Sequence, residues 1–139
     1  MIRFALNYLG IFFILLSVLS FFNIIYSYYF NLYLNIDTYF YTFLLSIIIG
    51  LISFFKNKID VKITIYTKIF AVIIGYFLLP LIISIPYYFS IYNLSFLSCY
   101  FESISGFTST GFTVFENIKH LDQSLIIWRS TSQWIGGIY

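Results

Sequence analysis

The chain has 139 residues, of which 61% are hydrophobic and 9% are charged, and its formal net charge is +2. Soluble domains usually carry about 25% charged residues, so this composition excludes an ordinary soluble domain and indicates a membrane protein. So small a net charge gives no reason to expect a nucleic-acid partner. The single cysteine, Cys99, excludes an internal disulfide or a thiolate zinc site, and we expect a small buried residue there.

The first predicted element is an apolar run from Phe4 to about Tyr26, long enough to cross a bilayer as a helix of ~20 residues. It exceeds the apolar core of a secretory signal and no Ala-x-Ala-like cleavage site follows, so we expect a retained helix. Arg3 flanks its amino end. Asn7 and Asn23 are predicted to make interfacial or helix–helix contacts.

A Tyr- and Asn-rich segment from Ser27 to Thr38 is predicted to form a short external turn, and a second span follows from Tyr39 to Phe55. Tyrosine rings are typical of a membrane–water interface, where they are partly in contact with water. The tyrosines assigned to this interface are Tyr26, Tyr28, Tyr29, Tyr33, Tyr39 and Tyr41.

A lysine cluster with one acidic residue, Asp60, marks the next loop as cytoplasmic, because such loops carry an excess of Lys and Arg. A more specific alternative is that the lysines of this loop bind phosphate or lipid head groups. The lysines are Lys56, Lys58, Lys62 and Lys68. This topology puts Arg3 inside and the Tyr-rich turn outside.

The third span is predicted from about Ile69 to Phe89, with Pro80 and Pro86 inside it. Proline lacks an amide hydrogen and clashes with the carbonyl four residues before it, so the helix should bend near Tyr76 and again near Ile82. Neighbouring helices must then cover the freed carbonyls.

The stretch from Phe96 to Thr113 is too apolar for a soluble loop, and too short and rich in hydroxyls to cross a bilayer alone. We interpret it as a re-entrant hairpin that enters from outside. Its first part, Phe96–Ser105, is predicted to form a helix of ~15 Å, about half of a ~30 Å hydrocarbon core. Asn93 or Ser95 could cap this helix, and Gly106 is predicted to end it.

The residues that follow are mostly hydroxyl side chains around one glycine. Backbone without helical hydrogen bonds is tolerated in a membrane only where protein buries it or where it lines a water-filled path. Its carbonyls can replace the hydration shell of a cation, as in a potassium-channel filter, and the helix end near Ser105 adds partial negative charge. We predict the carbonyls of Thr110 and Gly111 as cation ligands. The flanking filter residues are Thr108, Ser109, Phe112 and Thr113.

An alternative is that these Thr and Ser residues merely pack a helix interface, and the residues by themselves leave the two interpretations about equal. The polar segment from Val114 to Gln123 should return the chain to the outer surface, with His120 solvated. The last helix, Ser124 to Tyr139, would be ~24 Å long, short of a ~30 Å crossing, so the chain looks truncated within a membrane helix.

Glu102 and Arg129 are the two charges predicted within or near the hydrocarbon, where charges are costly unless paired or wetted. We expect an ion pair between them, or Arg129 bonded to filter carbonyls, that braces the loop. Gln133 is predicted to hydrogen-bond between helices, while Gly136 and Gly137 permit close helix approach.

Two ordered motifs carry a family resemblance. The first is Phe-Glu-Ser-Ile-Ser-Gly-Phe-Thr-Ser-Thr-Gly-Phe-Thr at 101–113, and the second is Leu121-Asp122 followed by Trp-Arg-Ser-x-x-Gln-Trp-Ile-Gly-Gly at 128–137. Together they resemble the first pore repeat of the TrkH family of bacterial potassium uptake proteins. The resemblance covers about residues 96–139, and the preceding helices fit only in number and topology.

Members of that family fold four helix, pore-loop, helix repeats around one pore. The resemblance therefore implies an all-α integral membrane protein with three spanning helices, a re-entrant pore helix with its filter loop and a truncated fourth helix. Residues 1–62 would hold two leading helices and the Lys-rich loop, and residues 63–139 the first repeat. Of the glycines in a Thr-Val-Gly-Tyr-Gly filter only the first is kept, at Gly111, which suggests looser selectivity.

The implied function is that of a pore-forming potassium uptake subunit in the bacterial inner membrane, with potassium as substrate and no cofactor. The implied partners are a second copy of the full-length protein and a cytosolic nucleotide-binding regulatory subunit similar to TrkA. Channel and symport mechanisms both stay open. One alternative is a structural or assembly membrane protein. An enzyme using Glu102 or His120 is disfavoured, because no nucleophile, base and orienting group occur at a workable spacing.

Overall fold

A computed structural model describes residues 2–55, 64–90 and 92–139. Every regular element in these ranges is a helix. In chain order they are α1 (Ile2–Tyr29), η1 (Tyr33–Asn35), α2 (Ile36–Phe55), α3 (Ile65–Ile83), α4 (Ile85–Tyr88), α5 (Phe96–Phe107), η2 (Ile118–His120) and α6 (Gln123–Ile138). Three segments are long and apolar enough to cross a membrane, namely Asn7–Tyr29, Tyr33–Ser53 and Ile65–Tyr88. The predicted all-helical class is confirmed, and the three predicted spans correspond to helices that are long and apolar enough to cross a membrane.

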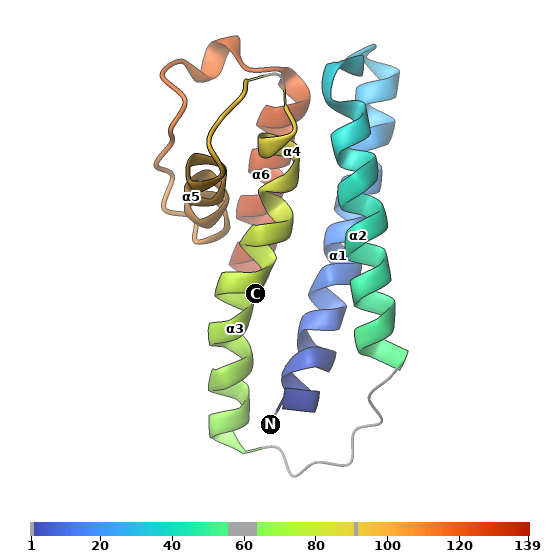
Figure 1. Cartoon of the computed structure of the whole chain (residues 1–139), viewed down its shortest axis with the longest axis vertical. Helices are drawn as coiled ribbons and strands as arrows, with labels where there is room; N and C mark the ends of the chain where they lie inside the picture. Colours follow the sequence, from blue (N-terminus) through green and yellow to red (C-terminus); the bar gives the residue numbers. More distant parts are fainter. Residues whose placement is uncertain (1, 56–63, 91) are drawn as a thin grey trace.

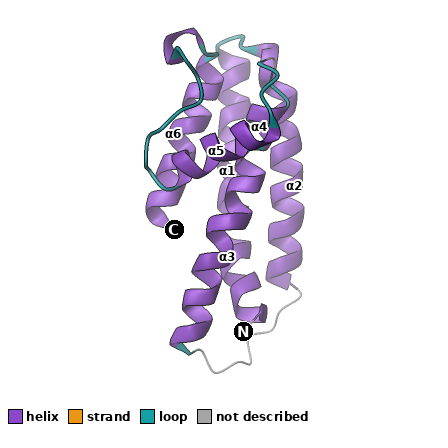
Figure 2. Ribbon diagram, turned by 60° about the vertical axis from the view of Figure 1, so that its left-hand side comes forward, coloured by secondary structure: helices purple, strands orange, loops and turns teal. Residues whose placement is uncertain are grey.

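The helices form two groups that lie side by side (Figure 1). α1 and α2 make an antiparallel hairpin, hereafter the leading hairpin, and α3 and α6 run beside it. The short α5 lies against α3 and α6, away from the hairpin. The chain descends from one end of the bundle to α5 and returns to that same end before α6 begins (Figure 2).

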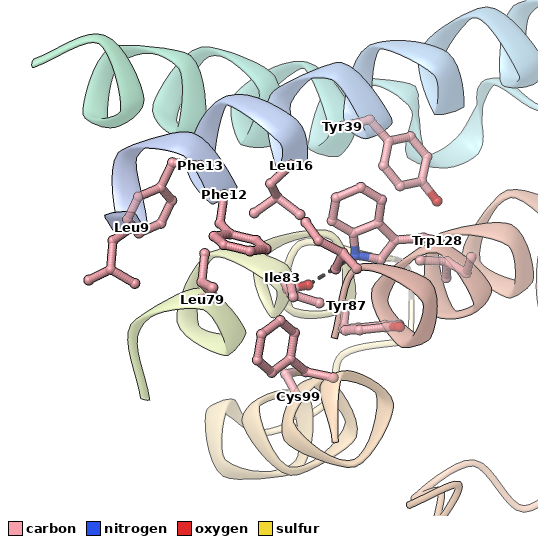
Figure 3. Packing of buried hydrophobic residues seen from close by; sticks show 13 residues of the cluster. Leu9, Phe12, Phe13, Leu16, Tyr39, Leu79, Ile83, Tyr87, Cys99 and Trp128 are labelled. Atoms are coloured by element: carbon pink, nitrogen blue, oxygen red, sulfur yellow. Dashed lines mark hydrogen bonds between the residues drawn. The ribbon is translucent and has the colours of Figure 1, made fainter. Parts of the chain in front are cut away.

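The core lies between the leading hairpin and the α3–α6 pair, where large side chains from different helices meet (Figure 3). Lipid tails are as apolar as these side chains, so close van der Waals packing holds the two groups together, and interhelical hydrogen bonds add to it. The largest of these fully buried residues include Leu16, Tyr39, Ile83, Tyr87 and Trp128.

Within the leading hairpin, small residues let the two helices come close. A Cβ added at Gly50 of α2 would lie 2.7 Å from Ile14 Cγ1 of α1, closer than carbon atoms can pack. Hydroxyl residues complete the contact, and several of them bond within their own helix, as Thr42 Oγ1 does to the Thr38 carbonyl at 2.8 Å. Small and hydroxyl residues are the usual means of close helix approach in a membrane.

The proline-containing segment is interrupted once. α3 is continuous across Tyr76 and ends at Ile83, and Ser84 separates it from α4, which carries Pro86 in its first turn. The break thus lies close to the bend predicted near Ile82. Trp128 Nε1 of α6 donates to the Ile83 carbonyl at 3.0 Å (Figure 3), so a neighbouring helix covers a carbonyl at the break, as expected.

Most of the tyrosines assigned to the interface are exposed, with Tyr28 at 69% and Tyr29 at 77%. The assignment is wrong for Tyr39, which is fully buried. Its ring packs on Trp128 at a centroid distance of 5.8 Å and its hydroxyl bonds to Ser124. A tyrosine near the end of a span can face a neighbouring helix instead of the interface, and periodicity in a single helix does not distinguish the two.

The predicted topology can be tested at exposed tyrosines near opposite ends of the bundle. Lys56, Lys58 and Lys62 lie outside the described residues, so we use Tyr66, 74% exposed at the start of α3, and Tyr29 at the end of α1. With Cys99→Ala as background, Tyr29→Cys should react with an impermeant thiol reagent in intact cells, and Tyr66→Cys only after lysis. Labelling of Tyr66→Cys before lysis would show that the predicted orientation in the membrane is wrong.

Candidate functional site

The short helix α5 begins at a side-chain cap. Ser95 Oγ accepts a hydrogen bond from the Ser98 amide at 3.2 Å, which confirms one of the two predicted caps. Cys99 is fully buried, as expected. The predicted end at Gly106 is wrong, because α5 continues to Phe107. A Cβ at Gly106 would lie 2.6 Å from Ser132 Oγ of α6, so this glycine serves helix contact rather than helix termination.

A second glycine brings the backbones of α5 and α6 together. A Cβ added at Gly136 would overlap with the carbonyl oxygen of Phe107, whereas a Cβ at Gly137 would meet no atom within 4 Å. The predicted role in close helix approach is therefore confirmed for Gly136 and wrong for Gly137. The end of α5 rests directly on the backbone of α6.

The loop after α5 folds back onto the end of that helix. The amides of Thr110 and Gly111 both donate to the Ser105 carbonyl, at 3.0 and 3.4 Å. Two residues have positive φ, Ser109 at 55° and Gly111 at 86°. A Cβ at Gly111 would meet open space, so glycine is favoured there for its backbone angles and not for room.

Glu102 links α5 to both the loop and α6. Its carboxylate is fully buried. Oε2 accepts from Thr113 Oγ1 and from the Val114 amide, each at 2.9 Å, while Oε1 lies 2.8 Å from Arg129 Nε. Both carboxylate oxygens are thus engaged by charge-assisted contacts, the condition under which a buried charge is tolerated.

Arg129 forms both of the interactions that we predicted as alternatives. Besides the ion pair with Glu102, its Nη2 donates to the carbonyls of Gly111 at 3.1 Å and Phe112 at 3.2 Å. Ser105 Oγ also donates to the Phe112 carbonyl, at 2.7 Å. The loop is therefore tied to α5 and α6 by one pair of opposite charges, in which Glu102 is fully buried and Arg129 is 12% exposed.

The predicted ligand carbonyls differ in their surroundings. The Gly111 carbonyl accepts from Arg129 and has one lone pair left, because a carbonyl oxygen has two. Among the described residues, no donor bonds to the carbonyls of Thr108, Ser109 or Thr110, and all three residues are exposed. Cation coordination by these carbonyls stays a prediction.

Two further predicted residues have modest roles. Gln133 takes part through its backbone, whose carbonyl accepts from Ser109 Oγ at 3.4 Å, and in the described part of the chain its side chain makes no hydrogen bond between helices. His120 is exposed at the end of η2, in line with the expectation of a solvated side chain.

Sequence reasoning missed the residue that starts α6. Asp122 caps the helix, with Oδ1 accepting from the Ser124 amide at 2.8 Å, and Oδ2 accepts from Asn35 Nδ2 of the leading hairpin at 3.1 Å. The first contact had a signal in the sequence, since an Asp just before a helical pattern is a typical cap. The second contact joins residues 87 positions apart and had none.

Comparison with known proteins places residues 35–139 in the TrkH family, described as cation transport proteins. An uncharacterized cation transporter of Methanocaldococcus jannaschii is 44% identical over 55 residues, which are 40% of this chain and 12% of that protein. The Trk system potassium uptake protein TrkI of Halomonas elongata is 40% identical over 60 residues, 43% of this chain and 11% of that protein.

The Trk system potassium uptake protein TrkG of Escherichia coli K12 is 39% identical over 46 residues, 33% of this chain and 10% of that protein. The matched segments are thus about a tenth of the length of these relatives. The family match covers most of the chain, including the α5 helix, the loop that follows it and α6. The chain therefore belongs to the TrkH family of cation transport proteins.

Proposed function

We propose that this chain forms part of the pore of a potassium uptake transporter, with backbone carbonyls of its 108–113 loop as cation ligands. One observation carries the proposal. Thr108, Ser109 and Thr110 are exposed, and no donor among the described residues bonds to their carbonyls. The Glu102–Arg129 pair holds the chain that follows them, through bonds to the Gly111 carbonyl and the Val114 amide. Carbonyls without donors on a braced loop are available to replace part of the hydration shell of a potassium ion.

The charges near the loop fit a cation site. Arg129 alone would repel a cation, since its guanidinium touches the Gly111 carbonyl, but the carboxylate of Glu102 balances it at 2.8 Å. The carboxyl end of α5 contributes partial negative charge on the same side. Because the Glu102–Arg129 pair has no net charge, the carbonyl dipoles of the loop dominate the local electrostatic potential.

The path of the chain supports a re-entrant arrangement. α5 has 12 residues, so its length is about 18 Å, well short of a ~30 Å hydrocarbon core. The segments before and after it reach the same end of the bundle (Figure 1). One loop supplies part of a coordinating ring, and we propose that further loops of the same kind, as in the family's four repeats, complete it.

The wider setting follows from the family. We propose that the complete transporter lies in the bacterial inner membrane as a homodimer and works with a nucleotide-binding regulatory subunit similar to TrkA. The relatives named as Trk system potassium uptake proteins support potassium as the transported ion. The transporter family also gives no reason to expect enzymatic chemistry in this chain.

Gly111→Ser should weaken the preference for potassium over sodium in the transporter that carries these residues. Its φ of 86° is unfavourable for a residue with a Cβ, so the loop must shift its carbonyls. Uptake of both ions in a potassium-requiring host measures the effect, with Gly137→Ser as a control because a Cβ there meets open space. Unchanged affinities for both ions would favour a structural or assembly role instead.

A further inference from the structure

A polar cluster joins the leading hairpin to the start of α6. Asn35 Nδ2 donates to Asp122 Oδ2 at 3.1 Å, the Tyr39 hydroxyl bonds to Ser124 Oγ at 2.9 Å, and Asn23 Nδ2 donates to the Ser124 carbonyl at 3.3 Å. Each bond has one partner on the hairpin and one on the first turn of α6 or its cap. We refer to these five residues as the hairpin–α6 cluster.

Four residues of the cluster are buried and Asp122 is partly buried, which makes the geometry of the cluster demanding. Asn35 and Asn23 are each 1% exposed, and Tyr39 and Ser124 are fully buried. Buried polar groups lose free energy unless they are hydrogen-bonded with good geometry, whereas apolar contacts tolerate sliding. The cluster therefore specifies one position of α6 relative to the hairpin, in addition to holding the two together.

The position of α6 matters at the candidate site. Arg129 lies two helical turns beyond Asp122, about 10 Å along the axis. Between them the helix is continuous. A displacement of the α6 start by the hairpin would therefore move the guanidinium against the loop carbonyls that it contacts at 3.1 and 3.2 Å. Hydrogen bonds at these distances weaken strongly with displacements of a few tenths of an ångström.

We propose that the leading hairpin is a positioning element for the cation site, and that Asn35 and Tyr39 act on the loop through Asp122, Ser124 and the α6 helix. This inference rests on the proposed function of the loop. The two residues are positioning residues, because in the described part of the chain neither makes a hydrogen bond or a ring contact with the loop. The leading helices thus set the geometry of the site without lining it.

Reversing the polarity of one contact tests the proposal. Asn35→Asp replaces the donor facing Asp122 Oδ2 with a second carboxylate, so α6 should be pushed from the hairpin. Adding Asp122→Asn supplies a donor from the other side and should rescue the contact, because asparagine caps helices as well as aspartate does. Tyr39→Phe is a milder second variant, which keeps the ring beside Trp128 and loses only the bond to Ser124.

Two measurements, hydrogen exchange and transport kinetics, test the effects of these variants. In the detergent-solubilised transporter that carries these residues, amide hydrogen exchange at 109–114 reports on the loop. In the transporter that carries these residues, potassium KM and selectivity over sodium report on the site. Asn35→Asp should raise KM about tenfold and speed loop exchange, Tyr39→Phe should do both to a smaller extent, and the double variant should restore both. Tyr33→Phe, which removes a hydroxyl bond inside the hairpin turn, is the matched control.

The outcomes separate this proposal from the proposed function. Faster loop exchange in Asn35→Asp and Tyr39→Phe, with rescue by the double variant, supports positioning even if Gly111→Ser leaves ion preference unchanged. Loop exchange that stays normal in Tyr39→Phe overturns positioning, as does a KM that stays normal in a transporter sensitive to Gly111→Ser. Loss of folded protein in Asn35→Asp without rescue by Asp122→Asn also contradicts it, because the contact would then not be the cause.

Discussion

Glu102→Gln is expected to destabilise the protein by about 3–5 kcal/mol and to abolish most transport by the complete transporter. The substitution preserves the shape of the side chain but removes the charge that balances Arg129, whose side chain is only 12% exposed. The uncompensated guanidinium would remain against the Gly111 carbonyl and oppose a cation at the loop. Thermal unfolding in detergent and potassium uptake measure the two effects separately.

The paired variant Glu102→Gln with Arg129→Gln should be more stable than either single variant, because removing both charges leaves neither one buried alone. Glu116→Gln is the matched control, since Glu116 is exposed in the segment that follows the loop. If the pair loses as much stability as the two single variants added together, the contact at 2.8 Å contributes no coupling and the bracing role of Arg129 is wrong.

Gly136→Ala should have the second largest effect, a loss of about 3 kcal/mol or more. The added methyl group would overlap with the Phe107 carbonyl, and the atoms in its way belong to the backbone of α5 and cannot rotate aside. Overpacking against a rigid partner typically costs about 1–3 kcal/mol, and a backbone partner lies at the upper end. The end of α5 should separate from α6, so loop exchange should also quicken.

The adjacent position gives an opposite expectation. Gly137→Ala adds its methyl group to open space and improves helix propensity, so it should be neutral or slightly stabilising. The two substitutions lie at adjacent positions, and each adds one methyl group. Equal melting temperatures for both would mean that α5 and α6 are not in backbone contact at Phe107.

The spans were predictable because apolar length alone identifies a membrane helix, and the pore-helix cap at Ser95 because capping is a local interaction. The end of α5 was not. Gly106 has the residue type of a helix terminator, yet its neighbour in space, Ser132, decides its role. Residue type predicts interactions between near neighbours in the sequence. It does not predict the contact of Gly106 with Ser132, which lies 26 residues away.

At the candidate site the sequence indicated the pair of Glu102 and Arg129, because two charges at similar depth in hydrocarbon need each other. It did not indicate that Arg129 would bond to the Gly111 carbonyl at the same time, which depends on the fold of the loop. The bond from Asn35 to Asp122 was also out of reach, since polar residues near the ends of spans are usually solvated.

The Glu102–Arg129 pair also has a consequence for how the protein enters the membrane during synthesis. The ribosome delivers Glu102 first, on α5, and Arg129 follows later, on α6. An arginine at the centre of a membrane helix costs about 2.5–3.5 kcal/mol at the insertion machinery. The carboxylate of Glu102, on an α5 helix that is already packed on α3, would offset that cost. We therefore expect α6 to leave the translocon only after α5 has packed against α3. Biogenesis of this segment would then follow its order in the chain.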